Sequence, residues 1–241
     1  MTLLDADNDP SVIGEDTWEL FEVIEESFGV KLGNYFELAG ITVGRLAERI
    51  DIQTAYPPSD GCLSSAVFYQ LRRAFKSVGD VPRTAVRPGT PLRTILPWRS
   101  RRADWNTLEM QLGLTLPQLT FPSWLALLCL VSPAACLISD RLFLGARFSW
   151  FEVALGSFAL TVPVFAACIP LARSFPTNCD TIGDLAKLVL ARNFVVFATK
   201  FGSPSEKDVL SSLRLLVATE TGRGLDEISS ETRIPPDLNI Y

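Results

Sequence analysis

The chain of 241 residues contains no histidine. Without an imidazole there is no Ser-His or Cys-His nucleophile pair, no imidazole metal ligand and no histidine proton relay near neutral pH. This absence excludes several large classes of hydrolase and metalloenzyme. No other group of residues in the sequence has the spacing of a catalytic or metal centre. We therefore expect no catalytic residues, no cofactor and no bound metal.

Cysteine is scarce, and its spacing does not suit metal binding. None of the five cysteines forms a C-x-x-C pair, and three of them lie inside apolar segments. A reduced cysteine in such a segment behaves as a small hydrophobic residue. We expect neither a disulfide framework nor a zinc site from Cys62, Cys129, Cys136, Cys168 and Cys179.

Positive charge is rare at the start of the chain. Residues 1–60 hold 13 acidic and three basic residues, whereas residues 61–109 hold nine basic and three acidic ones. Three interpretations fit this distribution. The two blocks pair with each other, the basic block faces anionic lipid headgroups, or both blocks are ordinary solvated faces. The basic residues are not interleaved with aromatics, so we expect no nucleic-acid partner. The polar, acidic N-terminus does not have the pattern of a signal peptide.

A long stretch without charge follows, from Glu109 to Asp140. Residues 121–138 are just long enough to cross a hydrocarbon core, and residues 148–171 are longer. Tryptophans near segment ends suit a membrane interface. The pattern predicts a two-helix transmembrane hairpin over residues 121–172 in a lipid bilayer. The alternative is a buried helical hairpin in a soluble protein.

Arginines near the outer ends of this hairpin predict its orientation. Arg101, Arg102 and Arg173 lie close to those ends, while Arg141 and Arg147 in the central loop weaken the asymmetry. The positive-inside rule favours a multi-pass protein of a bacterial-type inner (plasma) membrane with both termini cytoplasmic.

Outside the hairpin, apolar residues recur at helical spacing. Capping residues mark several helix starts, with Thr42, Thr181 and Ser205 as N-caps and Ser205–Asp208 as a capping box. We expect Tyr35 and Phe36 to anchor the first connector. The predicted helices cover residues 15–28, 43–50, 62–77, 99–112, 181 to about 201, and 205 to about 221.

The runs DTWELFEVIEESFGVKL (residues 16–32) and ITVGRLAERI (residues 41–50) resemble the later helices of acyl carrier proteins. In that family an Asp-Ser pair precedes the first of these helices, and the serine bears phosphopantetheine. Gly14 stands at the serine position here, and Trp98 stands there in a second copy. The resemblance therefore implies a degenerate carrier-like fold that carries no phosphopantetheine.

Internal repeats extend this resemblance. EMQLGLTL (residues 109–116) matches EESFGVKL (residues 25–32) in register, and TIGDLA from Thr181 matches TVGRLA from Thr42. The tail from Leu225 parallels the segment from Val81. We predict an all-α chain of two small acyl-carrier-like modules with the transmembrane hairpin inserted in one. Residues 11–52 with 205–241 form a split, circularly permuted module, residues 61–120 with 174–201 form the second module, and residues 121–172 form the hairpin.

The split module needs contact between the two ends of the chain. We expect the C-terminal helix to pack on the N-terminal one, because a lone amphipathic helix cannot bury its apolar stripe. The alternative is a homodimer that swaps its terminal segments, in which the same apolar stripes are buried against the partner chain. The residues predicted to meet are Leu213, Leu216 and Val217 with Leu20, Phe21 and Ile24.

Three functions remain open. The first is a non-catalytic protein-interaction role for an anchored protein, with the acidic first helix docking a partner that has a basic surface, although the same acids also suit a solvated face. The second is an acyl carrier or acyl-transfer participant at the membrane. The third is a small oligomeric transporter or channel subunit, which rests on Glu152 in the second apolar segment. The predicted docking residues are Asp16, Glu19, Glu22, Glu25 and Glu26.

Overall fold

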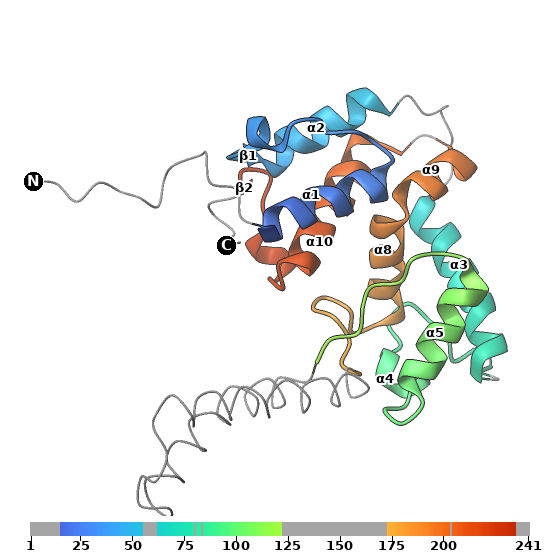
Figure 1. Ribbon diagram of the computed structural model, residues 1–241. Helices are drawn as coiled ribbons and strands as arrows, with labels where there is room; N and C mark the ends of the chain where they lie inside the picture. The colour runs from blue at the N-terminus through green and yellow to red at the C-terminus, as the bar shows by residue number, and fades with distance from the viewer. Residues whose placement is uncertain are drawn as a thin grey trace, which may run out of the picture. The chain divides into compact units, whose positions relative to one another are not determined.

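The computed structural model describes residues 15–54, 62–79, 81–82, 84–121, 173–202 and 204–234. These residues are mostly helical, which confirms the predicted all-α class (Figure 1). The chain divides into two compact units. The first unit comprises Met1–Pro97, Ala103–Pro117 and Pro176–Tyr241, and the second comprises Trp98–Arg102 and Gln118–Phe175.

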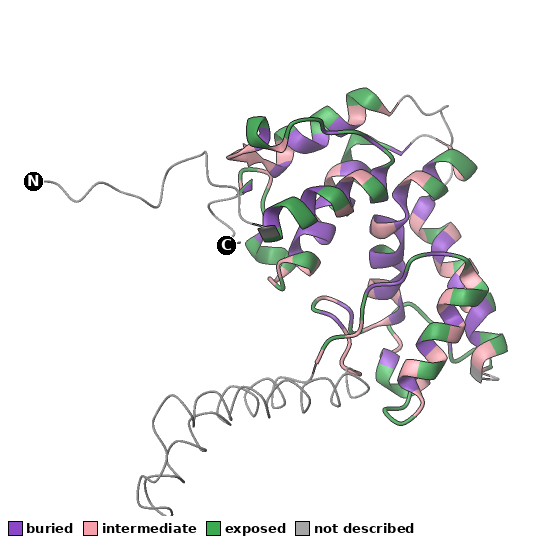
Figure 2. Cartoon of the chain, viewed as in Figure 1, coloured by how far each residue is buried: buried purple, intermediate pink, exposed green. Residues whose placement is uncertain are grey.

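The N-terminal segment begins with helix α1, Glu15–Phe28, which has the predicted bounds. The one-turn helix η2 (Tyr35–Leu38) and the short strand β1 (Ile41–Thr42) lead to helix α2, Val43–Gln53. The Thr42 hydroxyl accepts a hydrogen bond from the Arg45 amide, as its predicted capping role requires. The apolar positions of both helices lie inside, and Figure 2 shows them as buried stripes.

The middle of the chain supplies helices α3 (Leu63–Gly79), α4 (Leu92–Ile95) and α5 (Arg101–Leu112). The single helix predicted from residue 181 to about 201 is two helices, α8 (Ile182–Arg192) and α9 (Phe194–Phe201). They are separated at Asn193, whose φ of −123° and ψ of 32° are not helical.

The C-terminal segment begins with helix α10, Glu206–Glu220. Its capping box is confirmed: the Ser205 hydroxyl accepts from the Asp208 amide, and the Asp208 carboxylate accepts from the Ser205 amide. A 3₁₀ turn, η4 (Leu225–Glu227), and strand β2 (Arg233–Ile234) follow.

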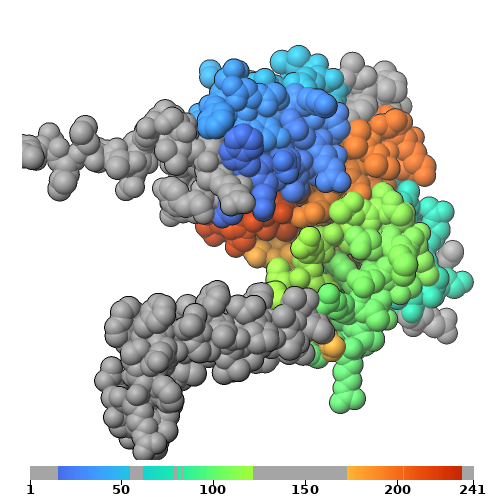
Figure 3. Space-filling model, in the orientation of Figure 1, coloured from blue at the N-terminus to red at the C-terminus, as the bar shows by residue number. Residues whose placement is uncertain are grey.

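The two ends of the chain meet within one molecule. Strand β2 pairs antiparallel with β1, Ile234 opposite Ile41 and Arg233 opposite Thr42. Helix α10 packs against α1 and α2, and Figure 3 shows the N-terminal and C-terminal segments in contact. The residues predicted to meet are all buried, namely Leu20, Phe21, Ile24, Leu213, Leu216 and Val217.

The sequence repeats recur as repeated hydrogen bonds. The Val43 amide donates to the Thr232 carbonyl at 2.9 Å, and the Ile182 amide donates to the Thr90 carbonyl at 3.0 Å. Each bond joins the first residue of a helix to a segment outside that helix, so the same arrangement occurs twice. One copy of this arrangement joins the two ends of the chain, and the other lies within its middle.

A second repeated feature follows α1 and α5. The Glu25 carboxylate accepts from the Leu32 amide at 2.5 Å, and the Glu109 carboxylate accepts from the Leu116 amide at 3.1 Å. Each helix ends at a glycine with positive φ, 66° at Gly29 and 60° at Gly113. The two matched motifs thus end their helices in the same way, with a glycine and a glutamate that binds a loop amide.

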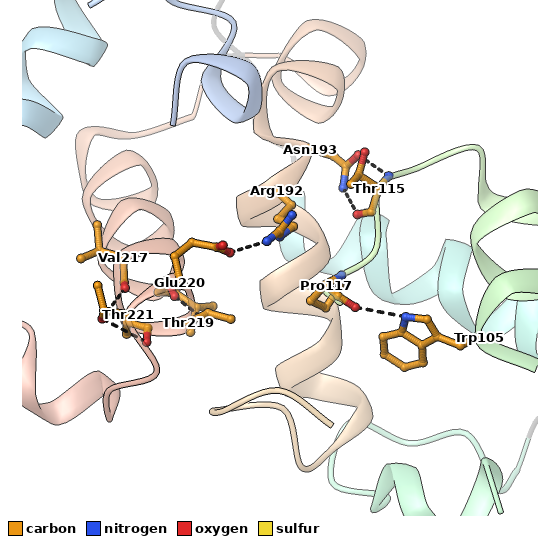
Figure 4. Close-up of polar contacts among 11 residues, drawn as sticks. Trp105, Thr115, Pro117, Arg192, Asn193, Val217, Thr219, Glu220 and Thr221 are labelled. Atoms are coloured by element: carbon orange, nitrogen blue, oxygen red, sulfur yellow. Dashed lines mark hydrogen bonds and ion pairs between the residues drawn. The ribbon is translucent and has the colours of Figure 1, made fainter. Parts of the chain in front are cut away.

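Helix α8 lies at the centre of the first unit, packed against α3, α10 and α1. Arg192, at its end, forms an ion pair with Glu220 of α10 (Figure 4). The buried Asn193 amide donates to the Thr115 carbonyl at 2.8 Å and accepts from the Thr115 amide at 2.9 Å. These polar contacts join α8 to α10 and to the loop after α5.

The predicted hairpin, residues 121–172, lies outside the described residues except for Phe121. Among the helices that the structure describes, none combines the length and the apolar character needed to cross a membrane.

Candidate functional site: an acidic face and a basic neck

Helix α1 carries the predicted docking residues on the side away from its buried stripe. Asp16, Glu19, Glu22 and Glu26 are exposed, whereas Glu25 is half-buried. This distribution follows from the helical period, because the apolar residues of α1 take the opposite positions. Four carboxylates thus line the open side of one helix.

Glu25 has a different role from the other four acids. Its carboxylate accepts hydrogen bonds from the Leu32 amide and, at 3.0 Å, from the Tyr35 hydroxyl. It therefore holds the connector after α1 in place. Burial, together with the neighbouring Glu25 carboxylate, raises the pKa of Tyr35 to about 12, so the phenol stays a hydrogen-bond donor at neutral pH.

Aromatic side chains lie beside the acidic residues. The Trp18 ring packs edge-on against Tyr35 and Phe36, with centroid distances of 5.2 and 5.5 Å. Trp18 is 38% exposed and Phe36 is 53% exposed, so the prediction that Phe36 anchors the connector is wrong. The connector buries Val30, Leu32 and Leu38 instead, and Phe36 lies on the surface. We call the surface formed by these acidic and aromatic residues the docking face, after the role predicted for its acids; it comprises Asp16, Trp18, Glu19, Glu22, Glu26 and Phe36.

Sequence reasoning missed the aromatic half of this face. The available signal was the position of Trp18, which falls between the acids and off the apolar stripe of α1. A large apolar side chain on the polar side of an amphipathic helix is unexpected for a purely solvated surface.

The described residues of the second unit lie where the chain enters and leaves the apolar segment. We call these residues, 98–102, 118–121 and 173–175, the neck. Thr120 and Ser174 exchange two backbone hydrogen bonds, of 2.9 and 3.0 Å. The Arg173 guanidinium donates to the carbonyl oxygens of Trp98 and Arg99, at 3.3 and 3.2 Å. The two ends of the apolar segment are thereby held side by side.

Arg101 lies inside this neck. Its guanidinium stacks on the Phe175 ring at 4.1 Å, contacts the Trp98 ring at 5.4 Å and donates to the Arg173 carbonyl at 2.7 Å. Burial lowers the pKa of Arg101 from its usual value, but an arginine stays charged throughout the physiological range. The neck therefore contains a fixed, partly desolvated positive charge.

The predicted pairing of the acidic block with the basic block does not account for the ion pairs in the described part of the chain. These pairs join Asp184 to Lys187 and Arg192 to Glu220, all of which lie outside both blocks. The acidic face of α1 thus takes part in neither of them.

The described residues also include two pockets and two cysteines. A pocket of about 450 Å³ is lined by Arg45, Arg49, Arg233 and Glu37 among others, and one of about 400 Å³ is lined largely by polar residues of α3 and α5. A hydrogen bond with Ser64 lowers the pKa of the exposed Cys62, whereas burial raises that of Cys179. No group of three potential metal ligands occurs among the residues described.

Comparison with protein-family models finds no match to this chain, and comparisons with curated proteins and with solved structures find no significant match.

Proposed function

We propose that this chain is a membrane-anchored, non-catalytic interaction protein. In this proposal two degenerate acyl-carrier-like modules lie on the cytoplasmic side of a bacterial-type inner membrane. One module presents the docking face to a partner protein with a basic surface, and the inserted segment anchors the whole. The observation that carries the proposal is the pair of hydrogen bonds between Thr120 and Ser174.

That pair constrains any path of the apolar segment. Residues 122–172 leave the neck and return to the same place, so a segment that crosses a bilayer does so an even number of times. Two crossings need about 20 residues each, and 51 residues allow two crossings and a short turn. The charge-poor sequence on either side of Asp140 supports the same arrangement.

The docking face supports an interaction role. Exposed carboxylates attract a basic partner from a distance, and an exposed aromatic side chain supplies contact area once the partner arrives. Trp18 and the neighbouring Glu19 and Glu22 combine both properties on one helix. Steering by such acids weakens as salt is added, which gives the proposed interaction a measurable signature.

The test uses the tagged full chain, purified from membranes with its crosslinked partners at low and high salt. The change Glu19→Lys with Glu22→Lys is expected to remove the salt-sensitive partners, and Trp18→Ala is expected to weaken their retention at all salt concentrations. A matched control reverses two other exposed acids, Glu206 of α10 and Glu231 (Glu206→Lys with Glu231→Lys), and keeps those partners. Unchanged capture by the double variant contradicts the docking role.

Phosphopantetheine labelling tests the rival acyl-carrier function. The protein is incubated with a phosphopantetheinyl transferase and labelled coenzyme A. We expect no label, because Trp98 and Gly14 stand where the resemblance to carriers requires a serine. A labelled serine replaces the interaction role with that of a carrier. Reconstituted ion flux that is lost in Glu152→Gln favours the transporter alternative instead.

A further inference from the structure

The described residues of the second unit are unusual in charge. Residues 98–102, 118–121 and 173–175 contain four arginines and no aspartate or glutamate. The same residues include Trp98, Phe121 and Phe175. Positive charge and aromatic rings are therefore concentrated where the chain enters and leaves the apolar segment. We call Trp98, Arg99, Arg101, Arg102, Arg173 and Phe175 the collar.

Contacts hold the collar together as a structure. Arg101 lies against Phe175 and Trp98 and donates to the Arg173 carbonyl, while Arg173 donates back to the Trp98 and Arg99 carbonyls. The positive charges of Arg101 and Arg173 consequently stay at the neck. Arg99 is exposed and Trp98 is 41% exposed, so a cationic group and an indole ring are open at the surface, while Arg102 and Arg173 are half-buried beside them.

We propose that the collar binds the phosphate groups of anionic lipids. Guanidinium groups bind phosphate with two parallel hydrogen bonds, and indole rings favour the headgroup level of a bilayer. Basic residues next to a membrane-inserted segment are attracted to a negatively charged leaflet. The collar combines all three features at both ends of the apolar segment.

The proposal rests on the membrane anchor proposed above and adds selectivity for the headgroup. An anchor that depends on hydrophobicity alone inserts equally into neutral and anionic bilayers. A collar of arginines distinguishes between them, because about 1 kcal/mol of attraction for each basic residue corresponds to about a fivefold preference. An experiment that varies the charge of the lipid headgroup therefore tests the collar separately from the anchor.

The experiment reconstitutes the full chain into phosphatidylcholine nanodiscs with and without phosphatidylglycerol. Lipids that stay bound after mild detergent extraction are counted by native mass spectrometry. The test variant is Arg99→Gln with Arg102→Gln, which leaves the packed Arg101 in place. The control is Arg87→Gln with Arg93→Gln, which removes the same charge from exposed residues of the first unit. A further arm adds inorganic phosphate as a competitor.

We expect the wild-type protein and the control to retain phosphatidylglycerol above its bulk fraction, and the test variant to lose this enrichment by about fivefold or more. If the protein inserts into the bilayer but retains phosphatidylglycerol only at its bulk fraction, the collar proposal is wrong and the membrane anchor is unaffected. Enrichment abolished by millimolar inorganic phosphate overturns the lipid assignment in favour of a free-anion site. Extraction of the protein from sealed vesicles by alkaline carbonate overturns the anchor and the collar together.

Discussion

The backbone amide of Gly44 donates a 2.8 Å hydrogen bond to the carbonyl oxygen of Ser230, near the other end of the chain. Gly183 donates a bond of the same length to Pro88. In both places a helix start lies against a segment from elsewhere in the chain, and in the first place the two segments belong to opposite ends of the sequence. This closure joins the two ends of the chain within one helical body.

Replacing either glycine tests whether the close approach is needed. A Cβ at Gly44 meets the Ser230 oxygen at 3.1 Å, and one at Gly183 meets the Pro88 oxygen at 3.0 Å. Alanine normally favours a helix over glycine by about 1 kcal/mol, but crowding a packed site costs about 1–3 kcal/mol. We expect Gly44→Ala and Gly183→Ala each to lower the free energy of unfolding by about 1 kcal/mol, measured by chemical denaturation.

Gly89 is the control, because a Cβ built there meets nothing within 4 Å and its φ is not positive. Gly89→Ala is expected to leave stability unchanged or slightly raised. Stabilisation by either of the other two changes contradicts the close packing of these segments.

The carboxylates after α1 and α5 lead to a second prediction. Glu25→Ala and Glu109→Ala each remove the acceptor of a loop amide, at Leu32 and at Leu116. A partly buried amide left without a partner costs about 1–3 kcal/mol. Urea denaturation is expected to show a loss of this size for each variant. The exposed Glu26 provides the control, since Glu26→Ala is expected to change the unfolding free energy by less than about 0.5 kcal/mol.

Asn193 supports the junction between α8 and α9. Its side chain donates to the Thr115 and Val189 carbonyls, at 2.8 and 2.9 Å, and accepts from the Thr115 amide (Figure 4). We expect Asn193→Ala to cost about 2–3 kcal/mol in thermal or chemical unfolding, because buried groups lose their partners. Asn106→Ala, at an exposed position of α5, serves as the comparison. Equal stability of the two variants argues against a structural role for Asn193.

The raised pKa of Tyr35 predicts that the free energy of unfolding depends on pH in the alkaline range. Its pKa in the folded protein is about 12 against an ordinary value of 10.0. Because the folded pKa is the higher one, the tyrosine's contribution to stability is complete below about pH 10 and is lost as the pH rises towards 12. Unfolding free energies of the wild type and Tyr35→Phe, measured from neutral pH upward, are expected to converge over this interval. A constant difference between the two proteins contradicts the assigned role.

Much of the helical fold follows from local patterns in the sequence. The stripe of Leu20, Phe21 and Ile24 has the period of a helix with one buried side, and Thr42 and Ser205 have the chemistry of N-caps. These signals act within one or two helical turns. For that reason the bounds of α1 and the caps of α2 and α10 agree with prediction.

Features that depend on tertiary contact were less predictable. The break at Asn193 lies in a run of apolar residues at helical spacing and depends on Thr115, which is far away in the sequence. The strands β1 and β2 contain two residues each, too few to show an alternating pattern. Phe36 has the composition of a buried anchor, but nothing local indicates that it packs edge-on against Trp18 at the surface. The acids of the docking face were recognisable, whereas its aromatic residues depend on how the connector folds.

The central claim is that the two ends of the inserted segment lie on the same side of a membrane. It is tested most directly by cysteine labelling in sealed vesicles, with single reporters at Thr120→Cys, Ser174→Cys and Gly145→Cys in a chain whose native cysteines are replaced by serine. An impermeant maleimide is predicted to label the first two reporters from one face and the Gly145 reporter from the opposite face. Labelling of Thr120→Cys and Ser174→Cys from opposite faces, or of all three from one face, contradicts the account.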